Sequence, residues 1–78
     1  MIPRMTRELR VVVRKTDESA ILVAAIRLAT VEWAEAEETA IDLGFVLWGN
    51  AEPVWIPDRD RRCYAEKQSA CEEWIEIA

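Results

Sequence analysis

Apolar and polar residues alternate along residues 7–15, the first regular pattern in the chain. Three apolar side chains share one face of this segment: Leu9, Val11 and Val13. The opposite face is mostly basic: Arg10, Val12 and Arg14. A period of two predicts a half-buried β-strand, and the basic residues would discourage pairing at an open edge.

A long helix is predicted next, from an N-cap at Thr16 or Asp17 to Leu43, with Gly44 as the left-handed residue that ends it. Seven apolar residues fall in one arc of the helical wheel and form the predicted core stripe: Leu22, Ile26, Ala29, Trp33, Ala36, Ala40 and Leu43. The first half is apolar on almost every side, so it needs cover from a second helix or another molecule. A strand through residues 20–26 is the alternative; the surrounding Ala, Leu, Glu and Arg residues favour the helix.

Two short apolar runs follow, at residues 45–48 and 54–56, and the turn-forming segment between them predicts a β-hairpin. With an even number of loop residues, Trp48 and Trp55 would share one face of the hairpin. An odd number would send at least one of them into the core.

A second helix is expected from Arg59, capped by Asp58, with one weak apolar face: Tyr64, Gln68, Cys71 and Ile75. Residues 73–77 fit either its last turn or a short closing strand with Ile75 and Ile77 inward. The sequence thus predicts one α+β domain over residues 1–78, in the order β-α-β-β-α with an optional final strand. With that strand the order is ferredoxin-like, with the long helix packed on an antiparallel sheet.

The net charge of −5 is unevenly distributed, because residues 17–52 carry eight acids against one arginine. Four of these acids line one side of the predicted helix at rises of about 4.5 to 6 Å: Glu32, Glu35, Glu38 and Asp42. Their repulsion costs a few tenths of a kcal/mol per pair. The row is either a solvated helix face or a surface that binds a basic protein partner.

Residues typical of catalysis and cofactor binding are scarce. The chain has no histidine and only two glycines, so we expect no enzyme activity, no metal and no cofactor. Cys63 and Cys71 would be too far apart on one helix for a disulfide and are expected to be reduced. The sequence starts without a signal-peptide pattern and has no apolar run long enough to span a bilayer, so we expect a cytoplasmic protein without membrane contact.

Tryptophan and arginine lie close together around the predicted hairpin, where Arg59, Arg61 and Arg62 follow Trp55. Such residues can stack on single-stranded bases, but the acidic surroundings argue against direct nucleic-acid binding. Trp48 and Trp55 are therefore either core residues or anchors of a protein interface, in which Trp and Arg contribute strongly to affinity.

In size, acidity, aromatic content and lack of catalytic residues, the whole chain resembles the small inhibitor proteins of phages and mobile elements, anti-CRISPR proteins among them. This resemblance rests on composition. It implies a non-enzymatic inhibitor in a host-cell cytoplasm that blocks the nucleic-acid-binding groove of a CRISPR effector subunit. The alternative is a structural or regulatory dimerisation module, such as an antitoxin or accessory subunit, that forms a homodimer through the same apolar surfaces.

Overall fold

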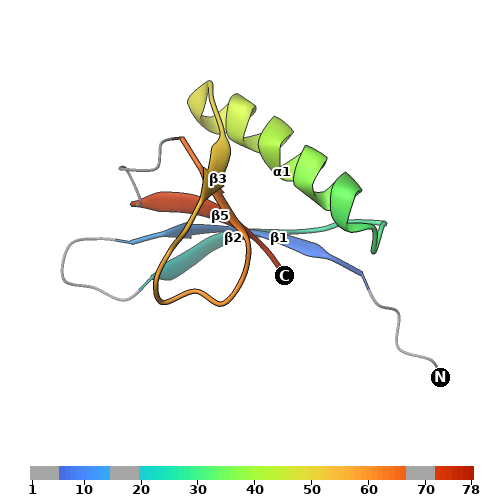
Figure 1. The fold of residues 1–78 in the computed structure, drawn as a ribbon, viewed down its shortest axis with the longest axis horizontal. Helices are drawn as coiled ribbons and strands as arrows, with labels where there is room; N and C mark the ends of the chain where they lie inside the picture. The colour runs from blue at the N-terminus through green and yellow to red at the C-terminus, as the bar shows by residue number, and fades with distance from the viewer. Residues whose placement is uncertain (1–5, 15–19, 67–71) are drawn as a thin grey trace.

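One α-helix packs on a five-stranded antiparallel sheet in the computed structural model, which describes residues 6–14, 20–66 and 72–78 (Figure 1). The elements in chain order are β1 (Glu8–Val13), β2 (Ile21–Arg27), α1 (Trp33–Trp48), β3 (Glu52–Val54), β4 (Cys63–Ala65) and β5 (Glu73–Ile77). The strands lie side by side in the order β2-β1-β5-β4-β3, so β2 and β3 form the two edges.

Strand β1 buries apolar side chains on both of its faces. Leu9 and Val11 pack under α1, together with Ile75 and Ile77 of β5. Val12 lies on the opposite face, in a second cluster that also holds Trp74 of β5 and Ile56 of the loop between β3 and β4. Figure 1 shows α1 on one side of the sheet and this loop on the other. The predicted strand is confirmed, with cover on its second face as well.

Small residues on one side of α1 let the helix approach the sheet closely. Its buried positions are Ala36, Ala40 and Gly44, four residues apart, and the helix packs mainly on β5 and β4. A Cβ atom on Gly44 would overlap the Cβ of Ala51 in the segment that follows the helix. Gly44 is therefore a close-packing position inside the helix. The helix ends instead at Gly49, which is left-handed with φ 79° and donates its amide to Phe45 O at 2.9 Å.

The predicted helix over residues 16–43 is wrong in its first half, which forms the strand considered as the alternative. Leu22 and Ile26 lie in β2, and Ala29 lies in the connection to α1. Strand β1 needs a partner for its outer backbone groups, and the pairing that begins at Glu8↔Arg27 supplies one. This outweighs helix propensities that differ by less than about 1 kcal/mol per residue. The predicted N-cap residues, Thr16 and Asp17, lie outside the described residues.

The predicted hairpin is also wrong. Residues 45–48 form the last turn of α1, because the buried Gly44 continues the helix. Val54 is extended as expected, but β3 pairs with β4 through Val54↔Cys63. Loop length therefore does not determine where Trp48 and Trp55 lie.

The predicted second helix is replaced by strand β4. Asp58 does not cap a helix; its carboxylate accepts two hydrogen bonds from Arg14 Nη2, at 2.5 and 2.6 Å. Gln68 and Cys71 lie outside the described residues. The closing strand is confirmed as β5, with Ile75 and Ile77 buried. The topology is thus ββαβββ, and neither β-α-β-β-α nor the ferredoxin-like order is found.

Gly44→Ala is expected to lower the free energy of unfolding by about 1 to 3 kcal/mol, because overlap with Ala51 outweighs the better helix propensity of alanine. In urea unfolding followed by tryptophan fluorescence, the Gly44→Ala/Ala51→Gly double variant should lose less than the two single variants lose together, since the overlapping methyl group is gone. Additive losses would contradict the close contact.

Candidate functional site

Four exposed carboxylates lie at the N-cap of α1 and along the helix: Glu32 at the N-cap, then Glu35, Glu38 and Asp42. We call this set the acidic face. The buried side of the same helix carries Ala36, Ala40 and Gly44, so the acidic face points away from the sheet. Within residues 6–14, 20–66 and 72–78, no arginine forms an ion pair with these four carboxylates. The acidic row is therefore a solvated surface, available to an external partner.

Glu37 lies on the same helix but takes part in an internal network. Its carboxylate accepts hydrogen bonds from Arg62 and, at 2.8 Å, from Trp33 Nε1. Partial burial opposes the ionisation of Glu37, but hydrogen bonds from Arg62, Tyr64 and Trp33 outweigh it and hold its pKa below the ordinary value. Arg62 and Arg7 also lie over the Trp33 ring, at 5.1 and 4.2 Å from its centroid. This network ties the start of α1 to β4 and to the residues before β1.

The arginines that follow Trp55 are used within the chain. Arg59 forms a two-point hydrogen-bonded ion pair with Glu76, whose side chain is fully buried, and Trp74 Nε1 donates to the same carboxylate at 2.9 Å. Arg61 Nη1 lies 3.8 Å from Glu76 Oε2, and Arg62 forms an ion pair with Glu37. These contacts account for the Trp and Arg cluster of the sequence as internal structure, and the expectation of no direct nucleic-acid contact stays a prediction.

Burial of Glu76 opposes its ionisation, yet hydrogen bonds from Arg59 and Trp74 outweigh burial and hold its pKa below the ordinary value. The ionised carboxylate is therefore part of the folded state. Sequence reasoning missed this pair because it placed Arg59 at the start of a helix, whereas Arg59 lies in the loop between β3 and β4.

The two candidate tryptophans have different environments. Trp48, at the end of α1, is half-buried and packs against the core cluster under the helix. Trp55 follows β3 and is 72% exposed. Trp48 therefore contributes to the core, whereas Trp55 is exposed; they do not form the shared hairpin face that an even-length loop would have given.

Exposed apolar side chains gather at two further places. The last turn of α1 exposes Phe45, Val46 and Leu47, and Val46 is 82% exposed. All seven residues of the edge strand β2 are exposed. The sequence contained a signal against an ordinary amphipathic helix here, because residues 20–26 are apolar on almost every side of the helical wheel.

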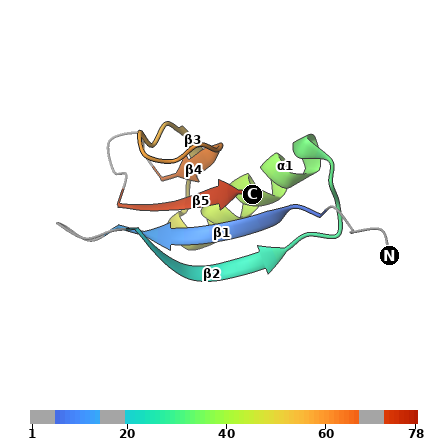
Figure 2. The same ribbon diagram turned by 90° about the horizontal axis from the view of Figure 1, so that it is seen from below.

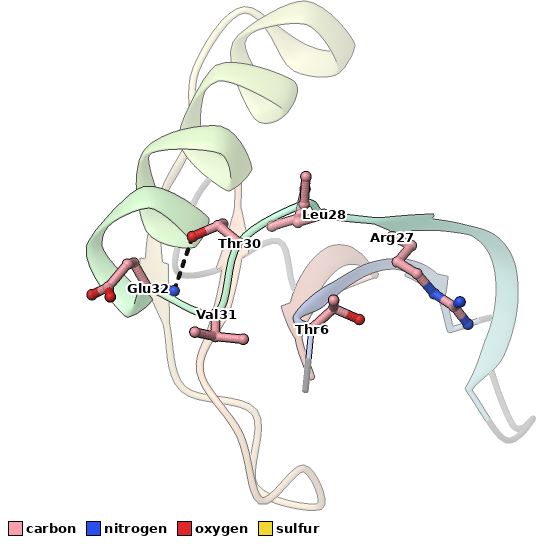
Figure 3. A pocket seen from close by; sticks show the side chains of 7 residues that line it. Thr6, Arg27, Leu28, Thr30, Val31 and Glu32 are labelled. Carbon is pink, nitrogen blue, oxygen red and sulfur yellow. Dashed lines mark hydrogen bonds between the residues drawn. The ribbon is translucent and has the colours of Figure 1, made fainter. Parts of the chain in front are cut away.

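An open hollow lies beside the connection between β2 and α1 (Figure 3). Thr6, Arg27 and Leu28 lie along it, and Thr30 Oγ1 accepts a hydrogen bond from the backbone amide of Glu32 at 3.0 Å. This bond shapes the turn into α1. We assign no chemistry to the hollow.

In the described part of the chain, no three His, Cys, Asp or Glu side chains are grouped closely enough to hold a metal ion. Cys63 is buried and donates weakly to Arg61 O at 3.5 Å. None of the described helices combines the length and apolar character that crossing a membrane requires. The absence of enzyme activity and the cytoplasmic location stay predictions.

Comparison of the chain with protein-family models, curated proteins and solved structures found no match in any of the three. Function is therefore argued from the surfaces of this structure, with the acidic face, Trp55 and β2 as the candidates.

Replacing Glu76 by Gln is expected to lower the free energy of unfolding by about 3 kcal/mol at pH 7, because it breaks a buried ion pair. The lowered pKa of Glu76 gives stability that is fully present above the unfolded-state pKa, about 4.3, and lost as pH falls through the folded-state pKa. The parent and Glu76→Gln unfolding curves, measured in urea from pH 7 to pH 2.5, should therefore converge at low pH.

Glu72→Gln is the matched control, since Glu72 is exposed and lies just before the same strand. It should change stability by less than about 0.5 kcal/mol at every pH. A constant difference between parent and Glu76→Gln across the pH range would show that ionisation of Glu76 is not the source of the effect.

Proposed function

We propose that this protein works by binding another protein, with the acidic face of α1 docking on a basic surface. The observation that carries this proposal is the unneutralised row of four carboxylates on the outer side of the helix. Like charges on one helix face cost stability without helping the fold. Binding of a basic protein surface by the row would explain why the chain carries this cost.

The spacing of the acidic face suits a groove that binds nucleic acid. Successive carboxylates are three or four residues apart, which gives rises of about 4.5 to 6 Å, and the whole row from Glu32 to Asp42 covers about 15 Å. Negative charges at such intervals can occupy the positions of successive phosphates on a basic protein surface. Charge complementarity of this kind also speeds association at low salt.

A CRISPR effector is the partner that the resemblance to anti-CRISPR proteins implies. In this proposal the protein is a non-enzymatic inhibitor of that kind, and it blocks the basic groove of an effector subunit by charge mimicry. Internal pairing of Arg59 and Arg62 supports the proposal, because it leaves negative charge dominant at the outer surface of α1.

Trp55 is the aromatic residue best placed to add affinity at a protein interface, because its indole is largely exposed. Trp48 is not part of the proposed contact, since it packs in the core. The alternative function, a dimerisation module, depends on a different surface, strand β2.

The test is a competition assay in which labelled target DNA binds a panel of purified CRISPR effector complexes, followed by fluorescence anisotropy. The parent protein is expected to reduce DNA binding by at least one complex, less strongly as salt rises, because salt screens exposed charges. The Glu35→Lys/Glu38→Lys variant should inhibit at least about 10-fold less, since two attractive contacts become repulsive.

Asp60→Lys/Glu72→Lys is the matched control, because it makes the same change in net charge at exposed residues outside the acidic face. It should inhibit as well as the parent. Equal losses in both double variants would assign the effect to net charge alone, and a panel in which no complex is inhibited would contradict a CRISPR effector as the target.

A further inference from the structure

Strand β2 is an edge strand with unusually little cover. It forms the outer margin of the sheet, with β1 on its inner side (Figure 2). All seven residues are exposed, and among the large apolar side chains Leu22 is 54% and Val23 59% exposed. Helix α1 packs mainly on β5 and β4, toward the other edge of the sheet. β2 thus presents apolar side chains and an open backbone edge together.

The backbone of β2 is set up to pair on its outer side. Leu28 donates its amide to Arg7 O at 2.9 Å, so its amide points toward the residues leading into β1. Backbone amides alternate in direction along an extended strand, so those of Arg27 and Ala25 point away from β1. Outward N–H and C=O groups of this kind are a template for another strand.

Two of the usual protections of an edge, proline and charge in the middle of the strand, are missing from β2. β2 contains no proline, and its single charged residue, Arg27, stands at its end. The pairing of β2 with β1 has a bulge at Val23, because Val11↔Ala24 is followed by Val12↔Leu22. A stretch from Ala24 to Arg27 is therefore regular, open and largely apolar. Such an edge in a soluble protein usually marks a pairing site.

We propose that a second copy of this chain pairs with β2 in antiparallel fashion, about a two-fold axis near Ala25. The two five-stranded sheets then form one continuous sheet. An antiparallel strand is its own complement, because the same outward amides and carbonyls serve both copies. Small side chains at Ala24 and Ala25 lie at the axis, where identical residues meet.

Charge and area both fit a second copy as the occupant. With the axis near Ala25, the two Arg27 side chains lie about 14 Å apart along the strands, beyond the screening length at physiological salt. The acidic faces lie on α1, which packs away from the β2 edge. With the same axis, residues 23–27 of the two copies lie opposite one another over about 17 Å, so the interface is at the small end of specific interfaces. The dimer is therefore expected to dissociate on dilution, in the micromolar range.

The two-fold axis has a geometric consequence. An antiparallel continuation of a sheet requires the axis to be perpendicular to the sheet, so both helices lie on the same side. The dimer would present two acidic faces on one surface. The dimer itself does not rest on the proposed function, because it depends only on β2.

The test is sedimentation velocity on the full chain from about 10 µM to about 1 mM. The parent should shift with concentration from 9.0 kDa to twice that mass. Ala25→Pro removes an outward amide and leaves the pairing with β1 intact, a position where edge strands tolerate proline. Val23→Lys places a charge on the same edge. Each variant should raise the dimer dissociation constant by at least about 10-fold, with an unchanged circular dichroism spectrum.

Val46→Lys is the matched control, since it puts the same charge on the highly exposed Val46 of α1, and it should dimerise like the parent. Hydrogen exchange adds a second readout that needs no variant. In the parent, the Ala25 and Arg27 amides should be protected at high concentration and exchange quickly after dilution, whereas the Leu28 amide stays protected throughout. A parent that is monomeric at about 1 mM, or a dimer that persists in both β2 variants, overturns the proposal.

Discussion

The ion pair between Arg59 and Glu76 is the constraint on which packing on the sheet face opposite α1 depends. Glu76 points from a central strand into a buried position, where an unpaired carboxylate would be strongly unfavourable. Its partner comes from the long loop between β3 and β4, so satisfying the charge fixes the loop against the sheet. Once fixed, the loop places Ile56 over Val12 and Trp74. The pair thus closes a second small core on the face that α1 does not cover, which is how a chain of 78 residues buries both sides of β5.

The same pairing determines where charge remains at the surface. Arg59 pairs with Glu76 and Arg62 with Glu37, so two of the loop arginines neutralise buried or half-buried carboxylates. Arg14, from the basic segment at the start of the chain, pairs with Asp58. Four of the described carboxylates that have no arginine ion pair lie together in the acidic face. The acidic face therefore depends on which carboxylates the arginines pair with, as well as on the number of acidic residues in the sequence.

Sequence patterns predicted those elements whose two sides have different surroundings. Alternation identified β1, and the helical stripe identified the buried Ala36 and Ala40 and the outward acidic row. Three segment predictions were wrong: the first half of the long helix, the hairpin and the second helix. Residues 45–48 form an apolar run compatible with a strand or a helix, and in the structure the helix continues through them, with Gly44 packed closely against Ala51. The sequence thus placed the acidic row on a helix that the structure contains, whereas the environment of Trp48 depended on tertiary contacts that no local pattern contains.

The prediction for residues 21–27, which form β2, was wrong for a more informative reason. Residues 21–27 were interpreted as a helix apolar on every side, which needs cover from elsewhere. In the structure they form a strand exposed on both faces, and the need for cover remains although the secondary structure changed. Periodicity arises only when one side of an element meets the core and the other meets water. An element whose two sides have the same environment gives no period, so the lack of pattern at β2 is itself consistent with a surface completed by another molecule.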